Sequence, residues 1–158
     1  MNDTTSKECF VCCKHRGEVD VPGGVIYEND LIYISHAQLW GDETEHYLGH
    51  VFVEPKRHVA EVADLTEEEA QIIGIYTKRI AKALLETEGM EHIYIFVFGD
   101  GAPHVHYHVI GRYPGAPREY WGTKVDEWPE APKGAEAEIA QVADRIRAYF
   151  KEHYVNSQ

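Results

Sequence analysis

The sequence has no long hydrophobic run and few basic residues, and both absences restrict its function. No stretch reaches the roughly 18 consecutive apolar residues that a membrane-spanning helix needs. Lys and Arg number 15 against 27 Asp and Glu, which gives a net charge of −12. Sequence-independent binding of DNA or RNA depends on neutralising phosphates with cationic side chains, so we expect no nucleic-acid partner and no membrane partner. A small phosphorylated ligand needs only a local pocket.

Cysteine is also scarce. The chain has only three, Cys9, Cys12 and Cys13, all near the N-terminus. An odd number of cysteines without a secretory signal fits a metal site or free thiols better than a disulfide framework. The opening residues, Met-Asn-Asp-Thr-Thr-Ser, lack the basic and apolar regions of a signal peptide. We therefore expect a reducing, cytoplasmic location.

The rest of the composition is that of an ordinary globular protein. The chain has 158 residues, 44% hydrophobic and 27% charged, which suits one domain with a substantial core. Alternating or β-rich runs predict strands at 25–27, 31–34, 49–54 and 92–98. Thr66 and Glu69 form a capping box before an amphipathic helix that ends at Gly89, and a last helix fits 135–153. These elements predict an α+β fold.

Three histidines at alternate positions, His104, His106 and His108, are the most informative feature. In a strand, alternate side chains share one face, so the spacing predicts three imidazoles about 7 Å apart on one surface. Val105, Tyr107 and Val109 would then face apolar packing. The chain has 10 histidines, so an inert or solvated cluster is the alternative. The apolar residues between them favour a built site.

The chain has, in this order, the segment from Gly49 to His58, a capped helix, a strand, and then the run His-Val-His-Tyr-His-Val-Ile. The order of these features resembles that of the histidine triad (HIT) superfamily. The resemblance covers roughly residues 9–112. It implies a five-stranded antiparallel sheet with a main helix packed on it, here followed by a C-terminal helix. It also implies a homodimer with a continuous ten-stranded sheet. Residues 1–112 would form the histidine triad domain, and 113–158, rich in Trp and Pro before the helix, would pack on it.

The resemblance also implies an activity. Members of this kind hydrolyse or transfer nucleoside phosphates, including dinucleoside polyphosphates and nucleoside phosphoramidates. By position, His106 would attack the α-phosphorus and form a covalent nucleotidyl-histidine, while His108 and His50 stabilise charge in the pocket. A nucleotide-binding module with little turnover is the alternative. A catalytic metal centre on the histidines is disfavoured, because no acidic residue follows His108 until Glu119.

Cys9 and Cys12 have the CxxC spacing that lets two thiolates bind one metal ion, which is half of a tetrahedral site. In zinc-containing members of the superfamily, the equivalents of His58 and His104 complete the set, so the resemblance implies a structural zinc ion. Cys13 could replace Cys12, and His15 could replace His58. Three buried, unliganded cysteines are the remaining alternative.

The expected substrate contacts depart from the family pattern. Many members carry a Gly-Gln-Ser or Gly-Gln-Thr element before the triad, where this chain has Gly99, Asp100, Gly101, Ala102 and Pro103. Backbone N–H groups of Gly99, Gly101 or Ala102 could bind an anion beside Asp100, although a plain hairpin turn is the alternative. The acidic residue that often binds ribose in the family is replaced here, around Ser35 or His36, and Ser35 is the candidate contact. Trp121 and Trp128 could cover the site or simply anchor the tail.

Overall fold

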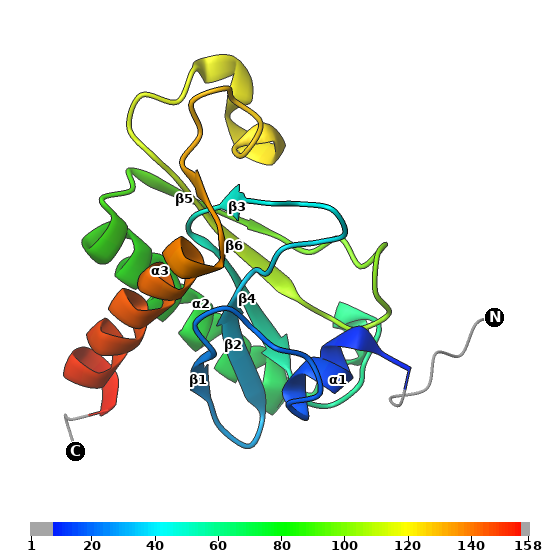
Figure 1. The fold of residues 1–158 in the computed structure, drawn as a ribbon. Helices are drawn as coiled ribbons and strands as arrows, with labels where there is room; N and C mark the ends of the chain where they lie inside the picture. The colour runs from blue at the N-terminus through cyan, green and yellow to red at the C-terminus, as the bar shows by residue number, and fades with distance from the viewer. Residues whose placement is uncertain (1–7, 156–158) are drawn as a thin grey trace.

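The computed structural model describes residues 8–155 and is built on a five-stranded antiparallel sheet (Figure 1). The strand order is β1-β2-β4-β6-β5. The strands are β1 (Val25–Glu28), β2 (Ile32–His36), β4 (His50–Pro55), β5 (His92–Phe96) and β6 (Tyr107–Arg112). The predicted α+β class and the antiparallel sheet are confirmed, and β5 pairs with β6, which carries His108. Of the two predicted segments, 1–112 and 113–158, residues 1–7 and 156–158 lie outside the described part.

Two helices cover one face of the sheet. Helix α2 (Glu67–Glu88) begins at the predicted capping box of Thr66 and Glu69 and ends at Gly89, which has a φ of 66°. Helix α3 (Glu136–Phe150) continues into a π-helical turn, η4 (Lys151–Val155). Helix α2 packs on β4 and β6, and α3 packs on β1 and β2. Their apolar residues join those of the strands in one core, which includes Ile34, Val53 and Val109. None of the described helices is both long and apolar enough to cross a membrane.

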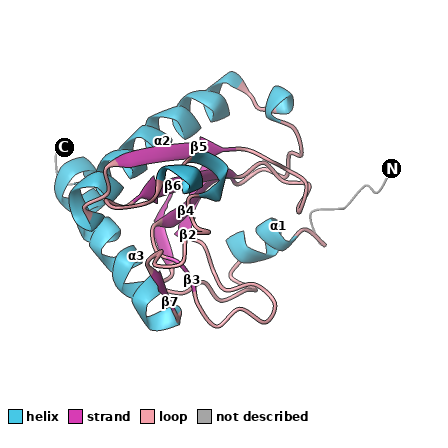
Figure 2. Cartoon of the chain, turned by 90° about the horizontal axis from the view of Figure 1, so that it is seen from above, coloured by secondary structure: helices cyan, strands magenta, loops and turns pink. Residues whose placement is uncertain are grey.

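The opposite face of the sheet carries the polar residues. In β4, His50, Phe52 and Glu54 alternate with Val51 and Val53 of the core, because successive side chains of a strand point to opposite faces. Helix α1 (Phe10–His15) lies across the sheet from α2 and α3 (Figure 2). One face of the sheet therefore stabilises the fold, and the other is left for a site.

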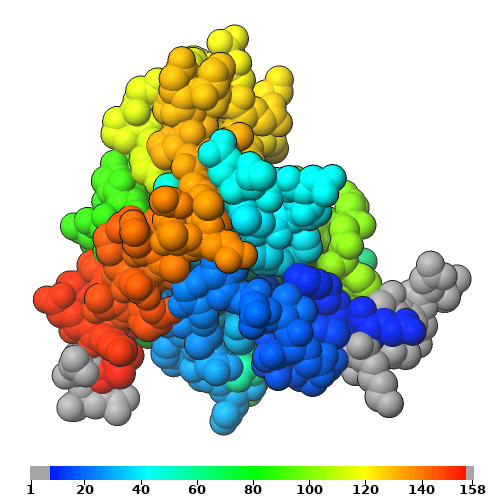
Figure 3. All heavy atoms as spheres, viewed as in Figure 1, coloured from blue at the N-terminus to red at the C-terminus, as the bar shows by residue number. Residues whose placement is uncertain are grey.

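The segment after β6 forms a second apolar cluster. Trp128 is buried there with Val125, Tyr47 and Ile110. Short 3-10 turns, η2 (Arg118–Tyr120) and η3 (Gly122–Lys124), precede the two-residue strand β7 (Lys133–Gly134). Strand β7 pairs with β3 (His46–Tyr47), and the space-filling view shows the orange tail against the cyan connection that carries β3 (Figure 3).

The structure adds one element and corrects one expectation. Cys12 and Cys13 lie on α1, a short helix that the sequence pattern did not predict. The regular strand β6 starts at Tyr107, so His104 and His106 precede it, and the three histidines do not share one surface. The β4–β6 ladder ends at Val53 and Tyr107, and the backbone N–H of Val105 instead donates to Val59. Nearby Pro55 has no N–H with which to extend the ladder.

We predict that buried His36 makes stability depend on pH. Its Nδ1–H donates to the Ala37 carbonyl and its Nε2 accepts from the Gly49 N–H, so the ring must be neutral. Burial lowers the pKa of His36 to about 4. The unfolded chain therefore binds more protons than the folded chain between pH 6.5 and 4, and stability falls as pH decreases through that window.

Urea unfolding at pH 7 and pH 5 measures this effect. For His36 alone we expect a loss of about 2 kcal/mol between the two pH values. The variant His36→Gln should be less stable at both, but its loss between pH 7 and 5 should be smaller by about that amount. An equal pH dependence in the two proteins would contradict the assignment.

Candidate functional site

A pocket of about 450 Å³ opens on the polar face of the sheet. Four histidines line one side of it, His46, His50, His106 and His108, and aromatic residues line another. This volume lies within the range typical of small-molecule sites, which is about 300–1,000 Å³. The pocket therefore combines an apolar wall with a group of nitrogen bases.

The ring of His106 is oriented by the backbone. Its Nδ1–H donates to the carbonyl oxygen of His104 over 2.7 Å. Because a carbonyl oxygen only accepts, this bond assigns the ring proton to Nδ1 and leaves the lone pair of the neutral imidazole on Nε2. Phe52 and His108 flank the ring at centroid distances of 5.7 and 4.9 Å. His106 is thus held as a nitrogen base at the pocket.

His50 and His108 form a hydrogen-bonded pair beside it. His50 Nε2 lies 2.9 Å from His108 Nδ1. Burial, with the nearby His46 and His108, holds the pKa of His50 well below its usual range. Burial and the neighbouring His106 lower the pKa of His108 to about 4. Both rings are therefore neutral at pH 7. The other nitrogen of His108, Nε2, is buried and has no hydrogen-bond partner among the described residues.

Helix α1 supplies much of the remaining pocket wall. Phe10, Val11 and Lys14 line it from α1, and the Phe10 ring lies 5.0 Å from that of Trp40. The buried Lys14 ammonium donates to Glu54 over 2.7 Å, and His15 donates to the other oxygen of that carboxylate. Burial alone would raise the pKa of Glu54, but Lys14 and His15 lower it to about 2. The carboxylate is therefore charged and paired.

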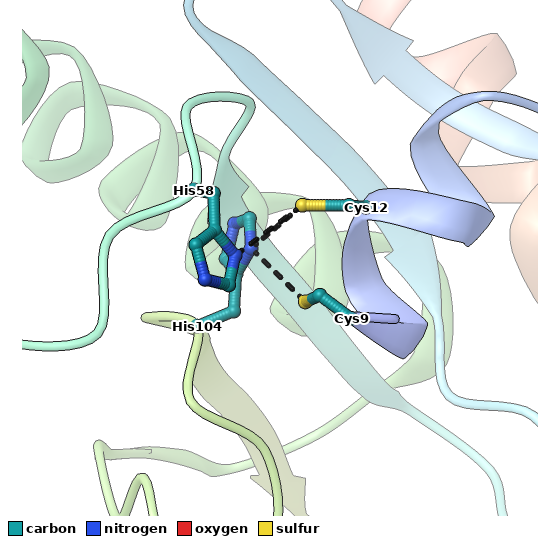
Figure 4. Close-up of side chains that lie close together, drawn as sticks. All are labelled: Cys9, Cys12, His58 and His104. Carbon is teal, nitrogen blue, oxygen red and sulfur yellow. Dashed lines mark hydrogen bonds between the residues drawn. The ribbon is translucent and has the colours of Figure 1, made fainter. Parts of the chain in front are cut away.

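Four further side chains form a candidate metal centre (Figure 4). One ligand atom from each of Cys9, Cys12, His58 and His104 lies within 4.8 Å of the others. His104 Nδ1 is 3.6 Å from Cys9 Sγ and 3.5 Å from Cys12 Sγ, and His58 Nδ1 is 3.4 Å from Cys12 Sγ. The structure thus brings together the four residues that the resemblance implies. Cys13 and His15 lie outside this set, and His15 instead binds Glu54.

The donor set fits a tetrahedral zinc ion. Zn–S bonds of about 2.3 Å and Zn–N bonds of about 2.0–2.1 Å put sulfur and nitrogen roughly 3.6 Å apart, close to the distances found here. His104 Nε2–H donates to the Pro55 carbonyl, so Nδ1 carries the lone pair toward the cysteines. Burial and the adjacent Cys9 raise the pKa of the Cys12 thiol to about 12, so a Cys12 thiolate requires a nearby positive charge.

Of the five residues expected to contact substrate, two line the pocket and three do not. Gly101 lines the pocket together with Ala102, whereas Gly99 and Asp100 are exposed in the turn and do not line it. Gly99 has a φ of 76°, as a tight turn requires. Ser35 lies opposite Phe52 on the same face of the sheet, but it is fully buried and does not line the pocket. Neither Trp121 nor Trp128 lines the pocket.

Sequence reasoning missed several pocket residues. Phe52 and Glu54 follow His50 at alternate positions of β4, so strand alternation alone could have identified them. Phe10 and Lys14 required knowledge of α1. His46 lies on β3, a strand of only two residues that depends on pairing with β7, and no local pattern marks it.

Comparison with known proteins agrees with the geometry. The family model described as HIT domain matches residues 18–115, and no curated protein matches the chain. Among solved structures, a Zn-bound histidine triad family protein from Mycobacterium smegmatis has a TM-score of 0.69 at 19% identity, covering 93% of this chain and 98% of that chain.

Two further structures show the same fold. A hypothetical histidine triad nucleotide-binding protein from Sulfolobus tokodaii gives a TM-score of 0.69 at 16% identity, over 95% of this chain and 99% of that chain. The NitFhit protein of C. elegans gives 0.58 at 24% identity, over 80% of this chain and 27% of that chain. Because the family model matches more than half of this chain, the chain belongs to the HIT domain family.

Proposed function

We propose that this protein is a nucleotidyl hydrolase or transferase that cleaves a nucleoside phosphate conjugate at the α-phosphate. The observation that carries the proposal is the orientation of His106, whose Nδ1 is bonded to the His104 carbonyl while the ring lines the pocket. A neutral imidazole nitrogen is a nucleophile that needs no further base. A dinucleoside polyphosphate or a nucleoside phosphoramidate would supply the electrophilic phosphorus.

The reaction would proceed in two displacements. His106 Nε2 forms a bond to the α-phosphorus, and the bond from phosphorus to the leaving group breaks with its electron pair on the leaving group. Water or another acceptor then attacks the nucleotidyl-histidine and releases His106. A covalent intermediate divides one difficult displacement into two easier ones. His108, whose Nε2 has no partner among the described residues, would bind the phosphate or the leaving group, and His50 would orient His108 from behind.

The other wall of the pocket suits a nucleoside. Phe10, Trp40 and Phe52 present aromatic rings, and Trp40 is 45% exposed. Aromatic faces bind planar bases by stacking. The family and the structural relative described as nucleotide-binding support a nucleotide ligand, and the apolar wall beside the histidines is consistent with it.

We predict that His106→Ala abolishes turnover. A screen of nucleoside phosphoramidates, dinucleoside polyphosphates and nucleotide sugars with native protein would identify the preferred substrate class. On that substrate, His106→Ala should lower kcat/KM by roughly 10³-fold or more, because the proposed covalent intermediate forms on His106. The exposed His153→Ala should leave kcat/KM unchanged. Tight nucleotide binding without turnover by native protein would indicate a binding module instead.

We also propose that the Cys and His cluster holds a structural zinc ion. Cys9 precedes α1 and Cys12 lies on it, whereas His58 follows β4 and His104 precedes β6. A closed set of four protein ligands leaves no position for substrate, so the ion would stabilise structure and not take part in the reaction. Zinc would fix α1, and with it Phe10 and Lys14, against the pocket.

We predict one zinc ion per chain in purified protein, measured by elemental analysis. Cys12→Ala should lose most of the metal and unfold at a temperature lower by about 5 °C or more, because metal binding contributes directly to folding stability. Cys13→Ala is the matched control and should keep one zinc ion per chain. A Cys12→Ala protein that retains stoichiometric zinc would rule out this ligand set.

Strand β5 supports the proposal of a homodimer. It forms an edge of the sheet, and Ile95 on it is 50% exposed, followed by Val97 at 40% and Phe98 at 56%. An uncovered apolar edge strand is a site for pairing with another strand. We propose that β5 pairs with the same strand of a second copy, which would continue the sheet across the dimer.

We predict that Ile95→Glu produces a monomer, whereas native protein sediments as a dimer at micromolar concentration. A buried carboxylate at the strand pair would cost more than the interface returns. The control Val62→Glu alters a residue of similar exposure, 45%, on η1 (Val62–Asp64), and it should remain dimeric. A native protein that sediments as a monomer would refute this proposal.

A further inference from the structure

A hydrogen-bonded chain of four side chains leads from the protein surface to the pocket. Glu43 Oε2 lies 3.2 Å from His46 Nδ1, His46 Nε2 lies 2.9 Å from His50 Nδ1, and His50 Nε2 lies 2.9 Å from His108 Nδ1. Glu43 is exposed and the three histidines are largely buried. The chain ends at His108 Nε2, which is buried at the pocket without a partner in residues 8–155.

Each contact between two imidazole nitrogens holds one proton, so the chain has two complete arrangements. In the first, all three rings are neutral with their protons on Nδ1, and His108 Nε2 is an acceptor. In the second, the chain contains one more proton. His50 and His108 are then protonated on Nε2, and His46 is protonated on both nitrogens beside the Glu43 carboxylate. His108 becomes a donor in the pocket without becoming charged.

We propose that Glu43 and His46 are positioning residues that store the proton which His108 exchanges with the reacting groups. This inference rests on the proposed function. As His106 Nε2 bonds to phosphorus, the leaving oxygen or nitrogen takes the Nε2 proton of His108. His108 Nδ1 takes a proton from His50 Nε2, His50 Nδ1 takes one from His46 Nε2, and His46 becomes neutral. When water attacks, His108 Nε2 accepts a proton from it and the transfers reverse, which restores the starting state.

In the second arrangement the added positive charge lies on the ring that is next to Glu43. His50 and His108 are buried among other imidazoles, and the pKa values of both are lowered. Of the three rings, His46 is the one that contacts a carboxylate within residues 8–155. The other titratable groups that influence the chain are His36 of β2, His106 and Glu54. Glu54 is already neutralised by Lys14 and His15.

The C-terminal segment holds His46 in this position. His46 pairs with Gly134 of β7, and the Leu48 N–H donates to the Pro132 carbonyl. The Tyr47 hydroxyl donates to the Gly111 carbonyl over 2.7 Å. A Cβ at Gly134 would come within 2.4 Å of the Glu138 side chain, so the close approach of β7 to the first turn of α3 requires glycine. The tail therefore contributes to the site through β3, although it does not contribute the nucleophile.

Aryl esters of adenosine 5′-monophosphate can test the proposal. A p-nitrophenolate leaves without a proton, whereas an unsubstituted phenolate is a strong base with a pKa of about 10 and gains from one. His46→Gln keeps a polar side chain that cannot carry the charge. We expect it to lower kcat for the phenyl ester by 30-fold or more and to change kcat for the p-nitrophenyl ester by less than threefold, within the range of general acid catalysis of about 10²–10⁴.

Glu43→Gln, at an exposed position, should lower kcat for the phenyl ester by a smaller factor than His46→Gln and leave the p-nitrophenyl ester rate unchanged. Glu43→Asp should restore most of the phenyl ester rate. Glu45→Gln alters a neighbouring exposed carboxylate and should leave both rates unchanged. An equal loss on the two esters in His46→Gln would show a purely structural role and overturn the proposal, as would no loss on either.

A second measurement does not require activity. Long-range ¹H–¹⁵N spectra report which ring nitrogen carries the proton in each histidine. As the pH is lowered, the protons of His50 and His108 should move together from Nδ1 to Nε2. In His46→Gln they should not. Tautomers of His50 and His108 that stay fixed as the pH is lowered would overturn the proposal. If native protein cleaves neither the esters nor any compound of the substrate screen, the proposed function fails, and these spectra still test whether His46, His50 and His108 exchange protons as proposed.

Discussion

The hydrogen bond from His106 Nδ1 to the His104 carbonyl is the constraint on which the site depends. It fixes the tautomer and the direction of His106. The same residue, His104, points its own ring at Cys9 and Cys12 and donates Nε2–H to Pro55. One residue therefore joins the candidate metal centre to the candidate nucleophile, so a loss of order at the cysteines would reach His106 through a single backbone unit.

The two faces of the sheet divide stability from chemistry. On one face, Val51, Val53 and Val109 are buried against α2 and α3. Burial of such side chains supplies the main favourable free energy of folding. The other face can then hold histidines and a Lys14–Glu54 ion pair, groups that are costly to bury and are retained only where they are hydrogen-bonded. Helix α1 closes one end of that face and the Trp128 cluster closes the other, with the pocket between them.

Local patterns in the sequence predicted the elements that local physics determines. Thr66, Glu69 and Gly89 set the ends of α2, and alternation marked β4 and β6. The CxxC spacing identified two of the four cluster residues, but His58 and His104 came only from the family resemblance. Helix α1 was missed because it has six residues and no side-chain cap, so contacts distant in sequence must stabilise it. His46 was missed because its role requires β7, nearly 90 residues away.

The most direct test is to trap the intermediate. Native protein mixed with its preferred substrate and quenched before steady state should carry one nucleotidyl group, and peptide mapping with NMR of the adduct can identify the modified atom. The orientation imposed by the His104 carbonyl predicts the adduct at Nε2 of His106. An adduct at Nδ1, on another residue, or none during active turnover would contradict the account.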